Sequence, residues 1–369
     1  KRANIDRIVE LYQLRNSTQI ILDDARRQLN EISHKIEILK REGKDAPAEI
    51  ESATSVKMRV RELEIEMNKI ENELNNELRW VPNIYAPDVP VGSTREQNKI
   101  IRTWGKPPEF NFEPKPNHVI IEELDLVDIL KGARIAGSHF LLFKGMGARL
   151  ERALINFMLD YHTRYHGYTE VAVPYLANRE TLFGTGQLPK LEEDMYHLEK
   201  DDFFLIPTAE VPVTNIHRDE ILGFADLPLK YVCYSACFRR EAGAYGAETR
   251  GMKRIHQFDK VELVNFAHPE RSFEQLEILL SEAEKIAQLL GIHYRVSLQC
   301  TGEMSFAGAK QYDIEAYAPV SNEWLEISSV SCFTDFQARR MNIKFRDIDK
   351  KVKFVHTLNG SGLALPRVF

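Results

Sequence analysis

The first 80 residues carry a hydrophobic repeat that restricts what this part of the chain can fold into. Apolar side chains recur at spacings of three and four, as in the seam of a coiled coil. A turn, Gly43-Lys44-Asp45-Ala46-Pro47, separates two such runs. We therefore predict an arm over residues 1–80, made of two antiparallel helices about 50 Å long. The seam positions are Leu22, Ala25, Leu29, Ile32, Ile36 and Leu39, then Val56, Val60, Leu63, Met67, Ile70 and Leu74.

The residues after the arm change in character. Pro82, Pro87 and Pro90 predict a stiff linker over residues 81–92, because proline fixes φ and ends helices. Residues 93–369 are then expected to form one main domain. Its strands cluster without regular βαβ order, which favours an α+β fold with an antiparallel sheet flanked by helices. The expected helices are 150–165 (through the stripe Leu150, Leu154, Phe157, Tyr161 and Tyr165) and 272–290, and the expected strands are 168–174, 231–238, 255–264, 294–300, 311–318, 324–329 and 352–357.

Composition excludes several classes of protein. Four cysteines in 369 residues do not form a disulfide framework. Cys233 and Cys237 lack a second cysteine or histidine pair at finger spacing, so we expect no zinc. No apolar run is long enough to cross a membrane, and the first residues lack the core of a signal peptide. The net charge of −6 leaves room for a local basic surface. We expect a cytoplasmic protein, and an organellar origin is not excluded.

Three charged groups interrupt apolar strands. Arg239, Arg240 and Glu241 end one strand, Glu262 lies inside the next, and Glu326 begins Glu326-Ile327-Ser328-Ser329. Each could lie on the solvent face of a sheet, but together they favour a shared polar site. Arginines bind carboxylate or phosphate, and Glu326 with Ser329 offers oxygen ligands that suit magnesium held partly by substrate phosphates. The chain contains neither the phosphate-loop signature G-x-x-x-x-G-K-S/T nor the dinucleotide-binding signature G-x-G-x-x-G after a strand. The short stretch Gly360-Ser361-Gly362 alone is typical of a turn.

Eight stretches, in order, resemble the seryl-tRNA synthetases, a family of class II aminoacyl-tRNA synthetases. They are Gly147-Ala-Arg-Leu-Glu-Arg-Ala-Leu-Ile-Asn-Phe-Met, Gly184-Thr-Gly-Gln-Leu-Pro-Lys, Ile206-Pro-Thr-Ala-Glu-Val-Pro, Phe238-Arg-Arg-Glu-Ala-Gly, Ile255-His-Gln-Phe-Asp-Lys-Val-Glu, Glu326-Ile-Ser-Ser, Asp335-Phe-Gln-Ala-Arg-Arg and His356-Thr-Leu-Asn-Gly-Ser-Gly-Leu-Ala. The resemblance implies a serine–tRNA ligase with the class II catalytic fold over 93–369. It implies that serine and ATP form seryl-adenylate, and that the seryl group then moves to the 3′ end of serine tRNA. Its partners are ATP, L-serine, serine tRNA gripped by the arm, and a second copy in a homodimer, with no membrane.

The same resemblance assigns site residues by motif. It places serine against the loop Thr208-Ala209-Glu210, with Glu210 on the ammonium, and against Glu262 and Ser361. It makes Arg239 and Arg367 catalytic, at the α-phosphate and on the γ-phosphate side. The further ATP-binding residues are Arg240, Glu241, Ile255, Phe258, Glu326, Ile327, Ser328 and Ser329, and Glu326 and Ser329 hold Mg²⁺ with ATP. The structural alternatives are a core aromatic for Phe258 and a helix cap for Ser361.

Two expectations concern the chain as a whole. The family's third motif continues past the arginine that matches Arg367, so the chain, which ends at Phe369, is expected to be truncated there. The alternative function is a synthetase-like tRNA-binding or amino-acid-binding protein with weakened catalysis. The presence of Glu210, Arg239 and Glu326 argues against that alternative.

Overall fold

The computed structural model describes residues 3–241, 252 and 254–369. Between the strands expected at 231–238 and 255–264 the sequence predicts a loop with three glycines, Gly243, Gly246 and Gly251, and these glycines lie outside the described residues. The chain divides into two compact units, Lys1–Val81 and Pro82–Phe369. Among the helices described, none combines the length and the apolar character that crossing a membrane requires.

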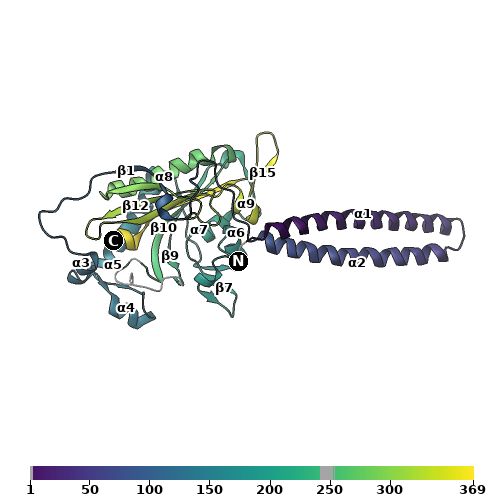
Figure 1. Ribbon diagram of the computed structural model, residues 1–369, viewed down its shortest axis with the longest axis horizontal. Helices are drawn as coiled ribbons and strands as arrows, with labels where there is room; N and C mark the ends of the chain where they lie inside the picture. Colours follow the sequence, from purple (N-terminus) through teal and green to yellow (C-terminus); the bar gives the residue numbers. More distant parts are fainter. Residues whose placement is uncertain (1–2, 242–251, 253) are drawn as a thin grey trace. The chain divides into compact units, whose positions relative to one another are not determined.

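The first unit is a pair of long helices that lie side by side, α1 (Ile5–Arg41) and α2 (Pro47–Leu78) (Figure 1). The side chain of Asn4 caps α1 by accepting from the backbone N–H of Arg7 at 3.1 Å. Pro47 stands in the first turn of α2, where its missing N–H costs nothing. The sequence therefore defines where each of the two helices begins.

Apolar side chains from both helices form the seam of this unit. Leu22 and Ala25 of α1 pack with Val60 and Leu63 of α2, all of them buried. A second cluster, in which Ile70 and Leu74 of the predicted seam pack with Leu11, lies nearer the open end; only Leu11 is absent from the predicted seam. Ion pairs cross between the helices outside the seam, namely Arg7–Glu73 at 2.7 Å, Arg26–Glu64 at 2.7 Å and Lys35–Glu49 at 3.0 Å. This is the antiparallel coiled coil that the repeat predicts.

The second unit is built on an eight-stranded sheet of order β1-β11-β12-β13-β16-β10-β9-β4. β9 pairs in parallel with β4, and the other neighbours pair antiparallel. The predicted fold class is therefore confirmed. The strands are β1 (Lys99–Trp104), β4 (Thr169–Glu170), β9 (Leu229–Phe238), β10 (Gln257–Ala267), β11 (Tyr294–Leu298), β12 (Lys310–Ala318), β13 (Glu323–Cys332) and β16 (His356–Ala364).

Shorter elements surround this sheet. The remaining helices are α3 (Asn117–Glu123), α4 (Ile129–Ala136), α6 (Arg179–Thr185), α7 (Glu210–Thr214), α9 (Phe336–Met341) and α10 (Leu365–Val368), with 3₁₀ turns at Arg95–Gln97, Glu192–Asp194, Asn215–His217, Phe224–Asp226 and Pro269–Arg271. The remaining strands are β2 (Val127–Asp128), β3 (Leu142–Phe143), β5 (Leu176–Asn178), β6 (His197–Leu198), β7 (Phe203–Leu205), β8 (Ile221–Gly223), β14 (Lys344–Arg346) and β15 (Val352–Phe354).

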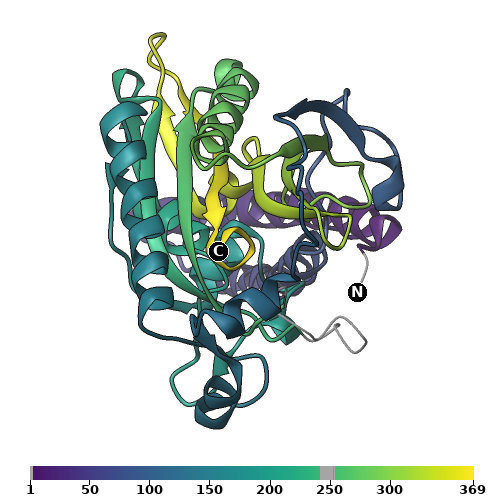
Figure 2. The same ribbon diagram turned by 90° about the vertical axis from the view of Figure 1, so that its left-hand side faces the viewer.

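Two helices bury one face of the large sheet, α5 (Met146–Tyr165) and α8 (Ser272–Leu289) (Figure 2). Leu276 and Leu279 of α8 share one core with Val261 and Leu263 of β10. Side chains alternate between the faces of a strand, so Lys260 and Glu262 of β10 point to the opposite face. The polar residues that interrupt apolar strands therefore gather on one side of the sheet.

Three local expectations are corrected by the structure. The glycine stretch 360–362 is no turn but part of β16, a central strand. A Cβ on Gly360 would lie 3.3 Å from Val330, so glycine lets β16 pack closely against its neighbours. The strand expected at 168–174 is only Thr169–Glu170; the N–H of Val171 still donates to Val232 O at 2.9 Å, but regular pairing with β9 does not continue to Pro174. Leu150 and Tyr165 of the helical stripe are exposed, by 41% and 69%, because Ile155 and Met158 bury the inner face of α5 instead.

Candidate active site

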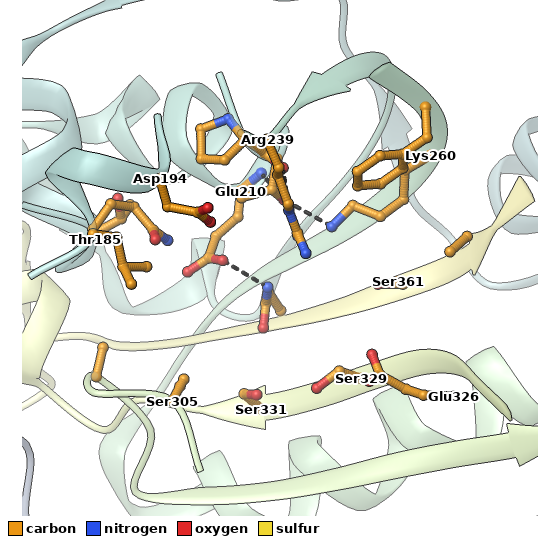
Figure 3. A pocket seen from close by; sticks show the side chains of 18 of the residues that line it. Thr185, Asp194, Glu210, Arg239, Lys260, Ser305, Glu326, Ser329, Ser331 and Ser361 are labelled. Carbon is orange, nitrogen blue, oxygen red and sulfur yellow. Dashed lines mark hydrogen bonds between the residues drawn. The ribbon is translucent and has the colours of Figure 1, made fainter. Parts of the chain in front are cut away.

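A cavity of about 460 Å³ opens over the polar face of the large sheet. β10, β13 and β16 supply its floor, and loops around residues 185–195, 207–210 and 304–307 supply its walls. Figure 3 shows the side chains along it: Thr185, Asp194 and Ser305 at one end, Glu210 and Arg239 near the middle, and Glu326, Ser329 and Ser361 toward the other end. The cavity therefore joins residues that are spread along the chain from Thr185 to Arg367.

Two buried carboxylates share a donor near the middle of the cavity. Glu210, at the start of α7, is 7% exposed and Glu262 of β10 is 1% exposed. The amide of Asn359 donates to both, at 2.9 Å to Glu210 Oε2 and 2.9 Å to Glu262 Oε1 (Figure 3 shows the first). Gln337 Nε2 donates to Glu210 Oε1 at 2.7 Å. Buried carboxylates persist only when hydrogen-bonded, and these side-chain amides satisfy that need.

A buried lysine neutralises part of this negative charge. Lys260 Nζ forms an ion pair with Glu262 and donates to Thr208 Oγ1 at 2.8 Å. Thr208 Oγ1 in turn lies 3.3 Å from Glu262 Oε2. Lys260 thus offsets part of the charge of the two carboxylates, and the guanidinium of Arg239 acts on Glu210 in the same direction.

Glu210 is the carboxylate that lines the cavity. Burial, followed by repulsion from Glu262, raises the pKa of Glu210 to about 7, while Gln337 and Lys260 act in the opposite direction. A ligand ammonium beside Glu210 would favour the ionised form of this carboxyl group. The environment of Glu210 is therefore suited to an amine.

Arg239 follows β9 and adjoins the acidic centre. Its Nε donates to Pro207 O at 3.4 Å, and its guanidinium carbon lies 5.1 Å from the centroid of the Phe258 ring. Figure 3 shows the guanidinium pointing into the cavity. Such a planar donor set fits a carboxylate or a phosphate. Phe258 lines the cavity. The structure therefore does not support the alternative that Phe258 is only a core residue.

The end of the cavity beyond Phe258 carries more charge. Arg254 Nη1 lies 3.4 Å from Glu241 Oε2, and Arg367 Nη1 donates to Glu326 O at 2.7 Å and lies 3.6 Å from Glu326 Oε2. The side chains of Arg254, Arg367 and Glu326 are about 51%, 35% and 45% exposed. This end is open and rich in arginine, which is suited to the phosphates of a nucleotide.

The donors predicted for magnesium fit an oxygen-ligated cation. Ser329 of β13 stands opposite Asp313 of β12, and Glu326 opposite Glu315. Burial, then the charge of Glu326, raises the pKa of Asp313 well above its usual range. A bound divalent cation would relieve that repulsion. Within residues 3–241, 252 and 254–369, no group of three or more His, Cys, Asp or Glu side chains forms a ready-made metal site. Magnesium does not need one, because it is commonly held by one or two carboxylates together with substrate phosphates.

The structure brings most of the predicted site residues to one cavity. These are Thr208, Glu210, Arg239, Glu241, Ile255, Phe258, Glu326, Ile327, Ser329, Ser361 and Arg367. Ala209, Arg240, Glu262 and Ser328 do not contribute to the wall of the cavity as far as the structure describes it. Glu262 lies behind Lys260 and Thr208, and the hydroxyl of Ser328 donates to Ser361 O at 2.7 Å. Ser361 lies in β16, so it caps no helix.

Sequence reasoning missed Lys260, Asn359 and Gln337. A signal for Lys260 was present, because it stands two residues before Glu262 and so shares one strand face with it. Asn359 and Gln337 lie in stretches that carry the family resemblance, but neither bears a charge that would single it out. Their role emerges only where they contact Glu210.

Comparisons with known proteins agree with this geometry. The tRNA synthetase class II core domain (G, H, P, S and T) matches residues 192–369, and the seryl-tRNA synthetase N-terminal domain matches residues 1–85. A serine–tRNA ligase of Geobacter sulfurreducens is 51% identical over 357 residues, covering 94% of this chain and 85% of the relative. A serine–tRNA ligase of Geobacillus kaustophilus is 51% identical over 366 residues, covering 99% of this chain and 86% of the relative.

Solved structures give the same result. The crystal structure of seryl-tRNA synthetase from Pyrococcus horikoshii complexed with ATP has a TM-score of 0.93 at 36% identity, covering 99% of this chain and 86% of that one. The fold and the cavity thus define a class II aminoacyl-tRNA synthetase, an ATP-dependent ligase. Within that class, the chain belongs to the seryl-tRNA synthetase family.

Proposed function

We propose that this chain activates serine with ATP and transfers the seryl group to the 3′ end of serine tRNA. The observation that carries the proposal is the buried Glu210, held by two amide donors beside the guanidinium of Arg239. This arrangement suits both charges of an amino acid, with the ammonium at Glu210 and the carboxylate at Arg239. The comparisons give no support to a binding protein without catalysis.

Adenylation follows from these positions. A carboxylate oxygen of serine attacks the α-phosphorus of ATP, and the bond from that phosphorus to the pyrophosphate oxygen breaks. The serine carboxylate is already ionised, so no general base is needed. Arg239 contacts both reacting groups and neutralises the charge that grows between them. Glu241, Ile255 and Phe258 hold the adenine, and Arg367 contacts the γ-phosphate side.

We propose that Glu326 and Ser329 hold Mg²⁺ together with the ATP phosphates. The exposure of Glu326, and the raised pKa of Asp313 to which the charge of Glu326 contributes, support this assignment. A divalent cation there supplies positive charge that stabilises the departing pyrophosphate. We include three further residues in the ATP site. Ile327 lines the cavity, and Ser328 supports the wall through its hydrogen bond to Ser361 O. Arg240 is included because it follows Arg239 in the chain.

The polar groups around Thr208 support a preference for serine. The hydroxyl of serine would bond within the set formed by Thr208, Lys260 and Ser361, and Glu262 keeps Lys260 and Thr208 in place. Alanine would leave one of these buried groups without its partner, which costs far more than the loss of a contact. Ala209 contributes its fully buried methyl group to the core beneath the loop.

We propose serine tRNA as the second substrate and the coiled-coil arm as its grip, a role supported by the family match over residues 1–85. We further propose a homodimer that acts in the cytoplasm. Large apolar side chains on α4 and α5 support the dimer: Leu130, Ile135 and Tyr165 are 81%, 73% and 69% exposed. Faces of this kind are commonly covered by another subunit.

Pyrophosphate exchange into ATP tests the proposal. Exchange is measured with serine and, as controls, with alanine and threonine. We expect exchange with serine alone. Equal exchange with alanine would contradict the assigned pocket, and a folded sample without any exchange would contradict the ligase function.

A further inference from the structure

Gln337 lies where three elements meet behind the amino-acid centre. It belongs to α9 and is fully buried, and its Nε2 donates to Glu210 Oε1 of α7 at 2.7 Å and to Thr185 O of α6 at 3.1 Å. Thr357 of β16, also fully buried, donates from Oγ1 to Gln337 Oε1 at 2.7 Å. The nitrogen and the oxygen of this amide therefore both have partners.

These hydrogen bonds fix which way the amide of Gln337 points. The oxygen and nitrogen ends of an amide have nearly the same shape, so only their partners distinguish them. Glu210 Oε1 and Thr185 O are both acceptors, and a reversed amide would direct its oxygen at them. The hydroxyl of Thr357 acts from the other side, because it gives the amide oxygen a donor. A buried network in which every member has a partner is rigid.

Thr357 is itself held on both sides of its backbone. Its N–H donates to Thr334 O at 3.1 Å, and its carbonyl oxygen accepts from Phe333 N–H at 3.0 Å. Thr357 stands two residues before Asn359 on one strand, so both side chains leave β16 on the same face. β16 thus brings one amide to Glu210 directly, through Asn359, and orients a second amide toward Glu210 through Thr357.

The helix that carries Gln337 packs closely on α6. A Cβ on Gly184 would lie 2.5 Å from Met341 Cγ, so the two helices meet where α6 has no side chain. In the same contact Arg340 Nη1 donates to Phe183 O at 3.2 Å. These contacts hold the backbone of α9 without Thr357, so the hydroxyl of Thr357 acts on the side chain of Gln337.

The donors at Glu210 matter because opposing effects act on its charge. Burial, then the charge of Glu262 on β10, raises the pKa of Glu210 to about 7. The amide of Gln337, and the charges of Lys260 on β10 and Arg239 after β9, lower that pKa. The ionised carboxylate is the form that binds an ammonium, so a weaker bond from Gln337 means weaker binding of serine.

We propose that Thr357 is a positioning residue for serine activation that acts on Glu210 through the amide of Gln337, an inference that rests on the proposed function. The hydroxyl of Thr357 holds the amide with its nitrogen toward Glu210, and the amide holds the carboxylate toward the serine ammonium. Thr357 is not part of the cavity wall as far as the structure describes that wall. Its contribution is therefore expected in the affinity for serine and not in the chemical step.

The first test removes the hydroxyl and keeps the shape of the side chain. In Thr357→Val we expect the KM for serine in pyrophosphate exchange to rise about tenfold, the scale of one buried polar group left without its partner, with kcat and the KM for ATP within about twofold. Thr357→Ser keeps the hydroxyl and should bring the KM for serine back to within about threefold of the original value. Thr163→Val removes a hydroxyl from α5, outside the described cavity wall, and is the matched control.

A pH profile separates positioning from a general loss of stability. The KM for serine falls as Glu210 ionises, and Thr357→Val should move the midpoint of that fall to higher pH, because the ionised form loses support. Thr357→Ser and Thr163→Val should leave the midpoint in place. A merely structural role would lower the melting temperature and kcat without moving the midpoint, and that result would overturn the proposal.

A double-mutant cycle tests whether Thr357 acts through Gln337. Gln337→Met keeps the length of the side chain without the amide, and should raise the KM for serine by more than Thr357→Val does. Adding Thr357→Val to it should change the KM no further, since the partner of the hydroxyl is already gone. If Gln337→Met does not fold, the midpoint of the pH profile in Thr357→Val decides alone.

The outcomes distinguish the two proposals. An unchanged KM for serine in Thr357→Val, or additive effects in the cycle, overturns the role of Thr357. Absence of serine-dependent exchange in the unaltered protein overturns the proposed function instead.

Discussion

The arm and the cavity place their charges in opposite ways. In the arm the apolar side chains lie inside and the ion pairs outside; Arg26 and Glu64 are 49% and 45% exposed. In the cavity the charged side chains lie inside, and Glu210 and Glu262 are only 7% and 1% exposed. Exposed ion pairs contribute little to stability, whereas a buried carboxylate persists only while its partners are present. The arm should therefore tolerate changes of charge, and the cavity should not.

Glu210→Gln should have the largest effect. The new amide would lose the charge that holds the serine ammonium and would point a donor at the amide of Asn359 or Gln337. We expect kcat/KM for serine in pyrophosphate exchange to fall about 1000-fold, the scale of breaking a buried charge pair, with the KM for ATP nearly unchanged. Glu199→Gln, at an exposed carboxylate, is the control. A fall below tenfold would show that Glu210 does not face the substrate.

Leu63→Ala breaks the arm where it is apolar. Leu63 is 2% exposed, so its truncation should cost the helix pair about 3 kcal/mol. Amide hydrogen exchange in α1 and α2 should speed up about 100-fold, while serine-dependent pyrophosphate exchange stays unchanged. Met58→Ala, at an α2 position 62% exposed, is the control. Equal acceleration throughout the second unit would mean that the two units unfold together.

Glu326→Gln tests the exposed end of the cavity. Loss of one ligand charge should raise the Mg²⁺ concentration for half-maximal exchange by about tenfold. The KM for serine should not change, since Glu326 does not belong to the buried centre. Titration of Mg²⁺ at saturating serine and ATP measures this effect. An unchanged Mg²⁺ requirement would remove Glu326 from the proposed metal site.

The pH dependence sharpens the comparison, because Glu210 titrates near neutrality. Its pKa is raised to about 7 from an ordinary 4.5, and the serine ammonium prefers the ionised carboxylate. The KM for serine should fall about tenfold as the pH rises from 6 to 8. The folding stability of the free protein depends on pH in the opposite direction. The contribution of protonated Glu210 to that stability is complete below pH 4.5 and is lost as the pH rises through 7. A serine KM that does not vary over this range would contradict the assignment.

Arg26→Gln should have the smallest effect. The pair Arg26–Glu64, with atoms 2.7 Å apart, is half exposed on both sides. Its loss should change the stability of the arm by about 0.5 kcal/mol, and less at high salt. Hydrogen exchange in α1 and α2 at low and high salt measures this change. An effect as large as that of Leu63→Ala would contradict the distinction between the inside and the outside of the arm.

The sequence alone determined the arm, the fold class and the family. The seam residues Leu22 and Val60 could be read directly, because contacts along a helix repeat every three or four residues and two helices joined by a short turn pair antiparallel. The motif residues Glu210 and Arg239 could be read because their stretches resemble a known family. These features depend on short stretches of chain.

Only the tertiary structure decided how the centre of the cavity is held. Asn359 lies 149 positions from Glu210 and 97 from Glu262, and Gln337 lies 127 from Glu210. β16 was missed because its glycines favour a turn locally, yet the sheet inserts it between β13 and β10. Thr357 and Gln337 meet for the same reason. Such contacts form only when distant strands and loops pack together, and the energy of packing overrides local preference.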